Sequence, residues 1–174
     1  ELHWFYQDGA SHIFPDAWER FLEPIPEDER HDLMGAYYKR LTGDDAAERD
    51  RCAIAWSSWE GETVSVQGPD ARPDRFAEAE FAVAFARIEC WYFMNGGFFP
   101  EENWLLNNVH RIRHLPCWIA QGRFDVVTPM TSAWALHRAW PEAKLDVVPD
   151  AGHASSEPGI IDSLVRGTDW AAGL

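Results

Sequence analysis

The chain has 174 residues, of which 46% are hydrophobic, so it can bury a core and is long enough for one domain or one and a half. Its formal net charge of −14 argues against nucleic-acid binding because such a surface repels phosphate backbones, and no apolar run approaches the roughly 20 residues of a membrane span. Three cysteines, Cys52, Cys90 and Cys117, are odd in number and form no CxxC pair, which argues against disulfides or a zinc knuckle and is consistent with a reducing, cytoplasmic location. Cys90 and Cys117 lie in apolar segments and are predicted to be inert, buried thiols.

The region from residue 12 to about residue 114 is predicted to be mainly helical. Prolines followed by acidic residues mark helix starts, glycines mark helix ends, and apolar residues recur at three- and four-residue spacing between them. The expected helices cover residues 15–22, 26–43, 44–61, 74–94 and 100–112. Residues 62–74 contain Gly68, Pro69 and Pro73 and are predicted to form a loop.

The spacing of apolar residues along the sequence changes after residue 114. Residues 117–122 and 144–148 are short apolar runs typical of strands, and residues 129–140 and 160–170 have helical patterns. This β-α-β-α order predicts two parallel strands whose carboxyl ends lie at the same edge of a sheet, where α/β folds place their functional sites.

Asp125 follows the first predicted strand, and His153 follows the second, 28 residues later. Because both strand ends emerge at one edge, the two side chains can meet. A carboxylate that binds one nitrogen of the imidazole ring leaves the other nitrogen available as a base. The alternative is that Asp125 is a turn or cap residue before Pro129 and that His153 is an ordinary loop histidine.

A hydrolase with this pair needs a nucleophile, normally a Ser within Gly-x-Ser-x-Gly. None of the serines considered has small residues on both sides; these are Ser11, Ser57, Ser58, Ser155 and Ser156. The chain order Ser, Asp, His therefore predicts a nucleophile before Glu1, so that this chain is a C-terminal part of an enzyme.

Glu89 is predicted to lie on an aromatic helix face, and Glu60 ends an aromatic segment. Two carboxylates beside aromatic rings can bind an ammonium group through charge and through the ring faces. The alternative is that Glu89 pairs with Arg87 and that Glu60 is a solvated acid at a helix end. No metal site is expected, since His110 and His114 form the only four-residue helical His pair, and no GxGxxG or phosphate loop implies a cofactor.

Several motifs resemble the proline iminopeptidases (prolyl aminopeptidases) of the α/β-hydrolase fold. The resemblance runs nearly end to end and includes both the Asp125 and the His153 motifs. The matching segments are residues 4–11, 56–61, 85–89, 122–125, 133–136, 139–143, 150–153 and 157–160.

The resemblance implies a partial α/β-hydrolase, with a mostly helical cap domain at residues 1–114 and parallel strands and helices of the core at residues 115–174. It implies that Asp125 is the triad acid and His153 the general base. It further implies that Glu60 and Glu89 hold the substrate's amino terminus, and that Phe93 and Tyr6 line the proline ring. The chain departs from the family at Thr128, where Cys is frequent, and at Cys90-Trp91, where Asn-His is frequent.

The implied function is that of a serine exopeptidase that releases N-terminal proline from peptides, with this chain inactive by itself because it lacks the nucleophile. Its partners would be peptides with a free N-terminal proline, with no nucleic acid and no membrane, and assembly into a homo-oligomer is left open. The alternatives are another capped α/β-hydrolase, such as an esterase or epoxide hydrolase, and a non-catalytic helical binding module.

Overall fold

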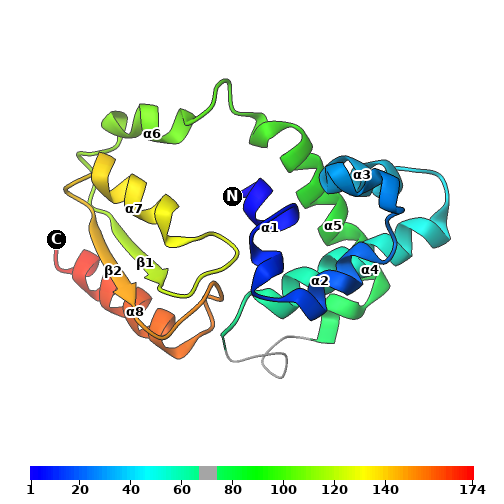
Figure 1. The fold of residues 1–174 in the computed structure, drawn as a ribbon. Coiled ribbons are helices and arrows are strands. Elements are labelled where there is room, and N and C mark those ends of the chain that lie inside the picture. Colours follow the sequence, from blue (N-terminus) through cyan, green and yellow to red (C-terminus); the bar gives the residue numbers. More distant parts are fainter. Residues whose placement is uncertain (67–73) are drawn as a thin grey trace. The chain divides into compact units, whose positions relative to one another are not determined.

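A computed structural model describes residues 1–66 and 74–174, which form two compact units (Figure 1). The first unit comprises Glu1–Thr63 and Gln67–Phe98, and the second comprises Val64–Val66 and Phe99–Leu174. The expected boundary between a cap and a core at residues 114 and 115 stays a prediction. Most of the loop expected at residues 62–74 lies outside the described residues, and its first two residues belong to a helix.

The described part of the first unit is helical throughout, as predicted. Its elements are α1 (Leu2–Tyr6), η1 (Ala10–His12), α2 (Pro15–Leu22), η2 (Glu27–Asp32), α3 (Leu33–Leu41), α4 (Ala46–Thr63), η4 (Asp74–Ala77), α5 (Ala79–Met94) and η5 (Gly96–Phe98). The short α1 was not expected, because its five residues have neither a side-chain cap nor an acidic first turn.

Two helix starts differ from the prediction because aspartates cap them. The helix expected over residues 26–43 is divided into η2 and α3, and the Asp32 carboxylate accepts the Gly35 N–H at 3.0 Å at the junction. Asp45 similarly accepts the N–H groups of Ala47 and Glu48 at 2.9 and 3.1 Å, so that α4 begins at Ala46, two residues after the predicted start.

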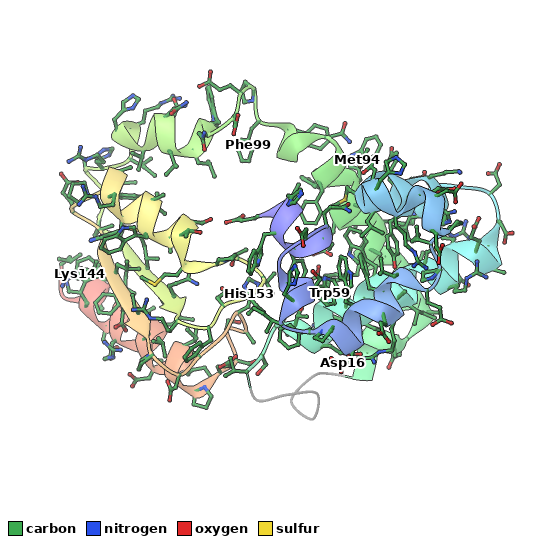
Figure 2. The ribbon with its side chains drawn as sticks, in the orientation of Figure 1. Asp16, Trp59, Met94, Phe99, Lys144 and His153 are labelled. Carbon is green, nitrogen blue, oxygen red and sulfur yellow. The ribbon has the colours of Figure 1, made fainter. Side chains whose placement is uncertain are left out.

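An aromatic core fills the first unit around α4, which packs against α2, α3 and α5. Trp56 and Trp59 of α4 are fully buried, and Trp59 is marked among the surrounding side chains in Figure 2. Phe21 stacks on Tyr37 with ring centroids 4.6 Å apart. Aromatic side chains therefore make up much of the core of this unit. Burial also raises the pKa of the Cys52 thiol to about 11 and that of Cys90 to about 12, which keeps both protonated and unreactive. The expectation that Cys117 is buried is wrong, because its side chain is partly exposed in the second unit.

The second unit contains the predicted parallel strand pair. Its elements are α6 (Trp104–Asn108), η6 (Val109–Arg111), β1 (Trp118–Gly122), α7 (Met130–Ala139), β2 (Lys144–Val148) and α8 (Pro158–Ala172). The two strands pair in parallel, with Trp118 opposite Lys144 and Gly122 opposite Val148. In Figure 1 the strands lie between α7 and α8, and both helices contact both strands. The chain is thus mostly helical with a small parallel sheet. Within the described ranges, no helix is both long and apolar enough to cross a bilayer.

A buried arginine ties three segments of the first unit together. Arg40 of α3 is 6% exposed, and its Nη1 donates to Glu29 Oε2 at 2.7 Å and to the Ala36 carbonyl at 2.9 Å. Its Nε lies 3.2 Å from Glu48 Oε1 of α4. Because a guanidinium cannot lose its charge inside a protein, the fold depends on these acceptors being in place.

We predict that Arg40→Ala lowers the free energy of unfolding by about 2 kcal/mol, because it removes a buried guanidinium and its bonds to the partly exposed Glu29 and Glu48. Lys39 is the matched control, since it pairs with the same Glu29 but is 70% exposed; Lys39→Ala is expected to change stability by less than about 0.5 kcal/mol. Chemical denaturation followed by Trp fluorescence measures both variants. Equal losses would contradict the prediction.

Candidate active site

Asp125 and His153 meet at the edge where both strands end, as their positions in the sequence predicted. His153 Nδ1 lies 3.0 Å from Asp125 Oδ2. The ladder between the strands continues past β1, because Arg123 N–H donates to the Val148 carbonyl at 2.8 Å and Phe124 N–H to the Ala151 carbonyl at 2.9 Å. Asp125 therefore leaves the sheet beside the loop between β2 and α8, on which Figure 2 marks His153.

Gly122 allows this close approach. A Cβ atom at this position would lie 2.0 Å from the Gly152 carbonyl oxygen and 2.6 Å from that of Ala151. No side chain fits at such distances from backbone atoms, so residue 122 must be glycine for the two loops to touch.

The Asp125 carboxylate is held by four donors besides His153. Oδ1 accepts the N–H groups of Val127 and Thr128 at 3.1 and 2.9 Å, and Oδ2 accepts Thr128 Oγ1 at 3.0 Å and Gln121 Nε2 at 3.1 Å. Asp125 is thus also the turn residue of the alternative interpretation. Burial would by itself raise its pKa, but the hydrogen bond from His153 and those from Thr128 outweigh burial and lower the pKa of Asp125, so the carboxylate stays ionised near neutral pH.

His153 is oriented by this carboxylate but remains accessible. Its side chain is 37% exposed, whereas that of Asp125 is 6% exposed. Thr128 Oγ1 also lies 3.2 Å from Nδ1. With Nδ1 directed at Asp125, Nε2 is the ring atom that can exchange a proton with a reacting group. The hydrogen bond from Gln121 to Asp125 was not predicted from the sequence. The position of Gln121 near the end of β1, four residues before Asp125, could have indicated it.

The first unit brings Tyr6, Glu60, Glu89 and Phe93 together around Trp56. The Tyr6 hydroxyl donates to Glu60 Oε1, and Trp56 Nε1 donates to Glu89 Oε2 at 2.9 Å. The Tyr6 ring stacks on Trp56 with centroids 4.4 Å apart, and the Phe93 ring lies 5.6 Å from that of Tyr6. We call these five residues the carboxyl-aromatic cluster. The role of Trp56 was missed, although it precedes Glu60 by one helical turn.

Glu60 is buried, so the alternative of a solvated acid at a helix end is wrong. Glu60 is 5% exposed, and burial raises its pKa to about 8. The nearby Glu89 raises this pKa further, and the hydrogen bond from the Tyr6 hydroxyl lowers it. Burial, followed by the charges of Glu60 and Glu89, also raises the pKa of Tyr6 well above its usual value. Burial thus favours the neutral form of Glu60, and a cation entering the cluster would favour its ionised form.

Among residues 1–66 and 74–174, no three His, Cys, Asp or Glu side chains are grouped so that they could hold a metal ion.

We predict that Glu60→Gln removes a pH dependence of stability. In the unfolded chain Glu60 ionises near its ordinary pKa, but in the fold it ionises only near pH 8, so its effect is to lower the stability of the wild type as pH rises from about 4.5 to about 8. The variant should gain on the wild type by up to about 1.4 kcal/mol per pH unit in this window. Urea unfolding at pH 5, 6, 7 and 8 measures the gap, and the exposed Glu80→Gln is the control. A constant gap would count against it.

No family model matches the chain, but curated relatives match nearly all of it. The "Probable proline iminopeptidase" of Leptolyngbya boryana is 59% identical over 169 residues, which cover 97% of this chain and 53% of that protein. The proline iminopeptidase of Xanthomonas citri is 53% identical over 99% of this chain and 55% of that protein. The one from Arabidopsis thaliana is 50% identical over 95% of this chain and 44% of that protein.

The chain therefore spans about half the length of the curated relatives it matches. Their names agree with the family that its motifs resemble. The chain is thus homologous, along nearly all of its own length, to about half of a proline iminopeptidase.

Proposed function

We propose that this chain supplies the acid, the base and the amine-recognition residues of a serine prolyl aminopeptidase with the α/β-hydrolase fold. The observation that carries the proposal is the 3.0 Å contact between His153 Nδ1 and Asp125 Oδ2, in a chain homologous to proline iminopeptidases. In this proposal residues 1–114 act as the cap, residues 115–174 belong to the catalytic core, and a nucleophilic Ser comes from outside residues 1–174.

In the proposed reaction, His153 Nε2 takes the proton of the Ser hydroxyl as its oxygen attacks the carbonyl of an N-terminal prolyl residue. The same proton then passes to the leaving amine, so that the peptide bond breaks and an acyl-enzyme remains. Water, activated by His153 in the same way, releases proline. Asp125 holds the ring so that Nδ1 carries the proton, and its lowered pKa keeps a negative charge beside the imidazolium that forms.

The carboxyl-aromatic cluster is proposed to bind the secondary amine of the N-terminal proline. A free amino terminus is cationic near neutral pH, so it would draw Glu60 into its ionised form and pair with Glu60 and Glu89. The Phe93 and Tyr6 rings, 5.6 Å apart, would provide the apolar contact for the pyrrolidine ring. A blocked amino terminus lacks the charge and should be rejected. A hydrolase of neutral esters would have no use for two carboxyls at this position.

The catalytic assignment predicts the behaviour of a chimera in which residues 1–174 replace the matching segment of the Leptolyngbya boryana protein. The chimera should hydrolyse prolyl 2-naphthylamide, and the 174-residue chain alone should not. Asp125→Asn should lower kcat about 10⁴-fold, because His153 would then carry its proton on the wrong nitrogen. Asp150→Asn, an exposed change in the His153 loop, is the control and should retain parental activity. Full activity of the Asp125→Asn chimera would refute the assignment.

The recognition assignment predicts a separate effect in the same chimera. Glu89→Gln should raise KM for prolyl 2-naphthylamide about 10- to 100-fold, because it removes a charged partner of the amine. Hydrolysis of a neutral naphthyl ester should change less than about twofold, and Glu80→Gln should affect neither substrate. Steady-state kinetics with both substrates and with N-acetylprolyl 2-naphthylamide measure the selectivity. An unchanged KM for the prolyl amide would favour an esterase or another capped hydrolase.

A further inference from the structure

Glu157 is a buried acid that the proposed reaction does not use. It is 4% exposed and immediately precedes α8, where an acidic side chain would ordinarily cap its own helix. Its carboxylate makes no such cap bond. Instead, Oε1 accepts the N–H of Val66 at 3.2 Å, and Oε2 accepts the N–H of Gly152 at 3.1 Å. Both acceptors of a buried carboxyl are thus directed at two backbone segments far apart in the sequence.

The segment at residues 64–66 also binds the loop that carries His153. The carbonyl of Val64 accepts the N–H of His153 at 3.0 Å and that of Ala154 at 2.8 Å. Together with the bond from Gly152 to Glu157, three consecutive N–H groups around the imidazole are therefore fixed. Residues 64–66, which directly follow α4, thus contact the His153 loop through the Val64 carbonyl. Glu157 joins the same two segments a second time, because its carboxylate accepts the N–H groups of Val66 and Gly152.

The close packing at Gly152 supports the same conclusion. A Cβ atom on Gly152 would lie 3.2 Å from both Glu157 Oε1 and a methyl group of Val66. The loop backbone thus fits directly against the carboxylate and the supporting segment. On its other side, the carbonyl of Ala151 accepts the N–H of Phe124, next to Asp125. A shift of the loop would therefore change the distance between Asp125 and His153.

We propose that Glu157 is a positioning residue for His153, which it places against Asp125 by fastening residues 64–66 to the Gly152–His153 backbone. The inference deepens the proposed function in that it concerns the proposed base. The contacts themselves do not depend on that role. Glu157 would act only through the position of the loop backbone. Loss of its carboxylate should therefore weaken the hydrogen bond between His153 Nδ1 and Asp125, although both of those side chains are still present.

Nitrogen-15 NMR of the labelled 174-residue chain tests this proposal without measuring catalysis. In Glu157→Gln, the amide keeps one acceptor but turns its NH₂ group toward a backbone donor, so the His153 Nδ1–H should exchange with water about tenfold faster than in the wild type. Asp125→Asn identifies that proton, because an amide replaces the carboxylate that accepts it. Glu142→Gln, an exposed change in the same unit, is the matched control and should leave the exchange rate unchanged.

A purely structural Glu157 would lower the unfolding free energy but leave the His153 ring signals as in the wild type, and this result would overturn the proposal. If Glu157→Gln does not fold, hydrogen exchange in the wild type decides. The Val66 and Gly152 amides should exchange at least about tenfold more slowly than exposed amides, and equal rates would overturn the proposal. An inactive chimera would refute the proposed peptidase while leaving this result unaffected.

Discussion

The parallel pairing of β1 with β2 is the constraint on which the candidate catalytic pair depends. With Gly122 opposite Val148, the two strands end side by side, and both following loops start from the same edge. The loops then touch because residue 122 has no side chain to separate them. Asp125 and His153, 28 residues apart in the chain, are consequently in hydrogen-bond contact. A slip of the register would remove that contact even if every side chain were retained.

Buried carboxyl groups determine the chemistry of both units, and their surroundings give them different properties. Asp125 receives several N–H and O–H donors, so its pKa is lowered in spite of burial. Glu60 has the Tyr6 hydroxyl and a neighbouring acid, so burial dominates and its pKa rises to about 8. Glu157 has two backbone donors and serves as a support. The number and kind of donors, rather than the residue type, therefore separates a permanent charge, a charge that a cation can induce, and a structural bridge.

Much of the fold followed from local patterns, and the differences have identifiable causes. The helices α2 and α7 and the two strands were predicted from the spacing of apolar residues and from Pro and Gly, because these signals act over a few residues. The helix expected at residues 74–94 is divided into η4 and α5. The division between η2 and α3 was missed because only the side chain of Asp32, which accepts the Gly35 N–H, marks it. The five-residue α1 lacks any such start signal, and it is held by its buried Phe5 and Tyr6.

The sequence by itself determined which residues are the candidates for the proposed chemistry: a carboxylate and an imidazole after successive strands, and two acids beside aromatic rings. It did so because strand ends, glycines and helical spacing are local properties. Only the tertiary structure decided their surroundings, such as the indole of Trp56 on Glu89, the amide of Gln121 on Asp125 and the burial that raises the pKa of Glu60. These depend on burial and on donors from distant segments, which no local pattern records.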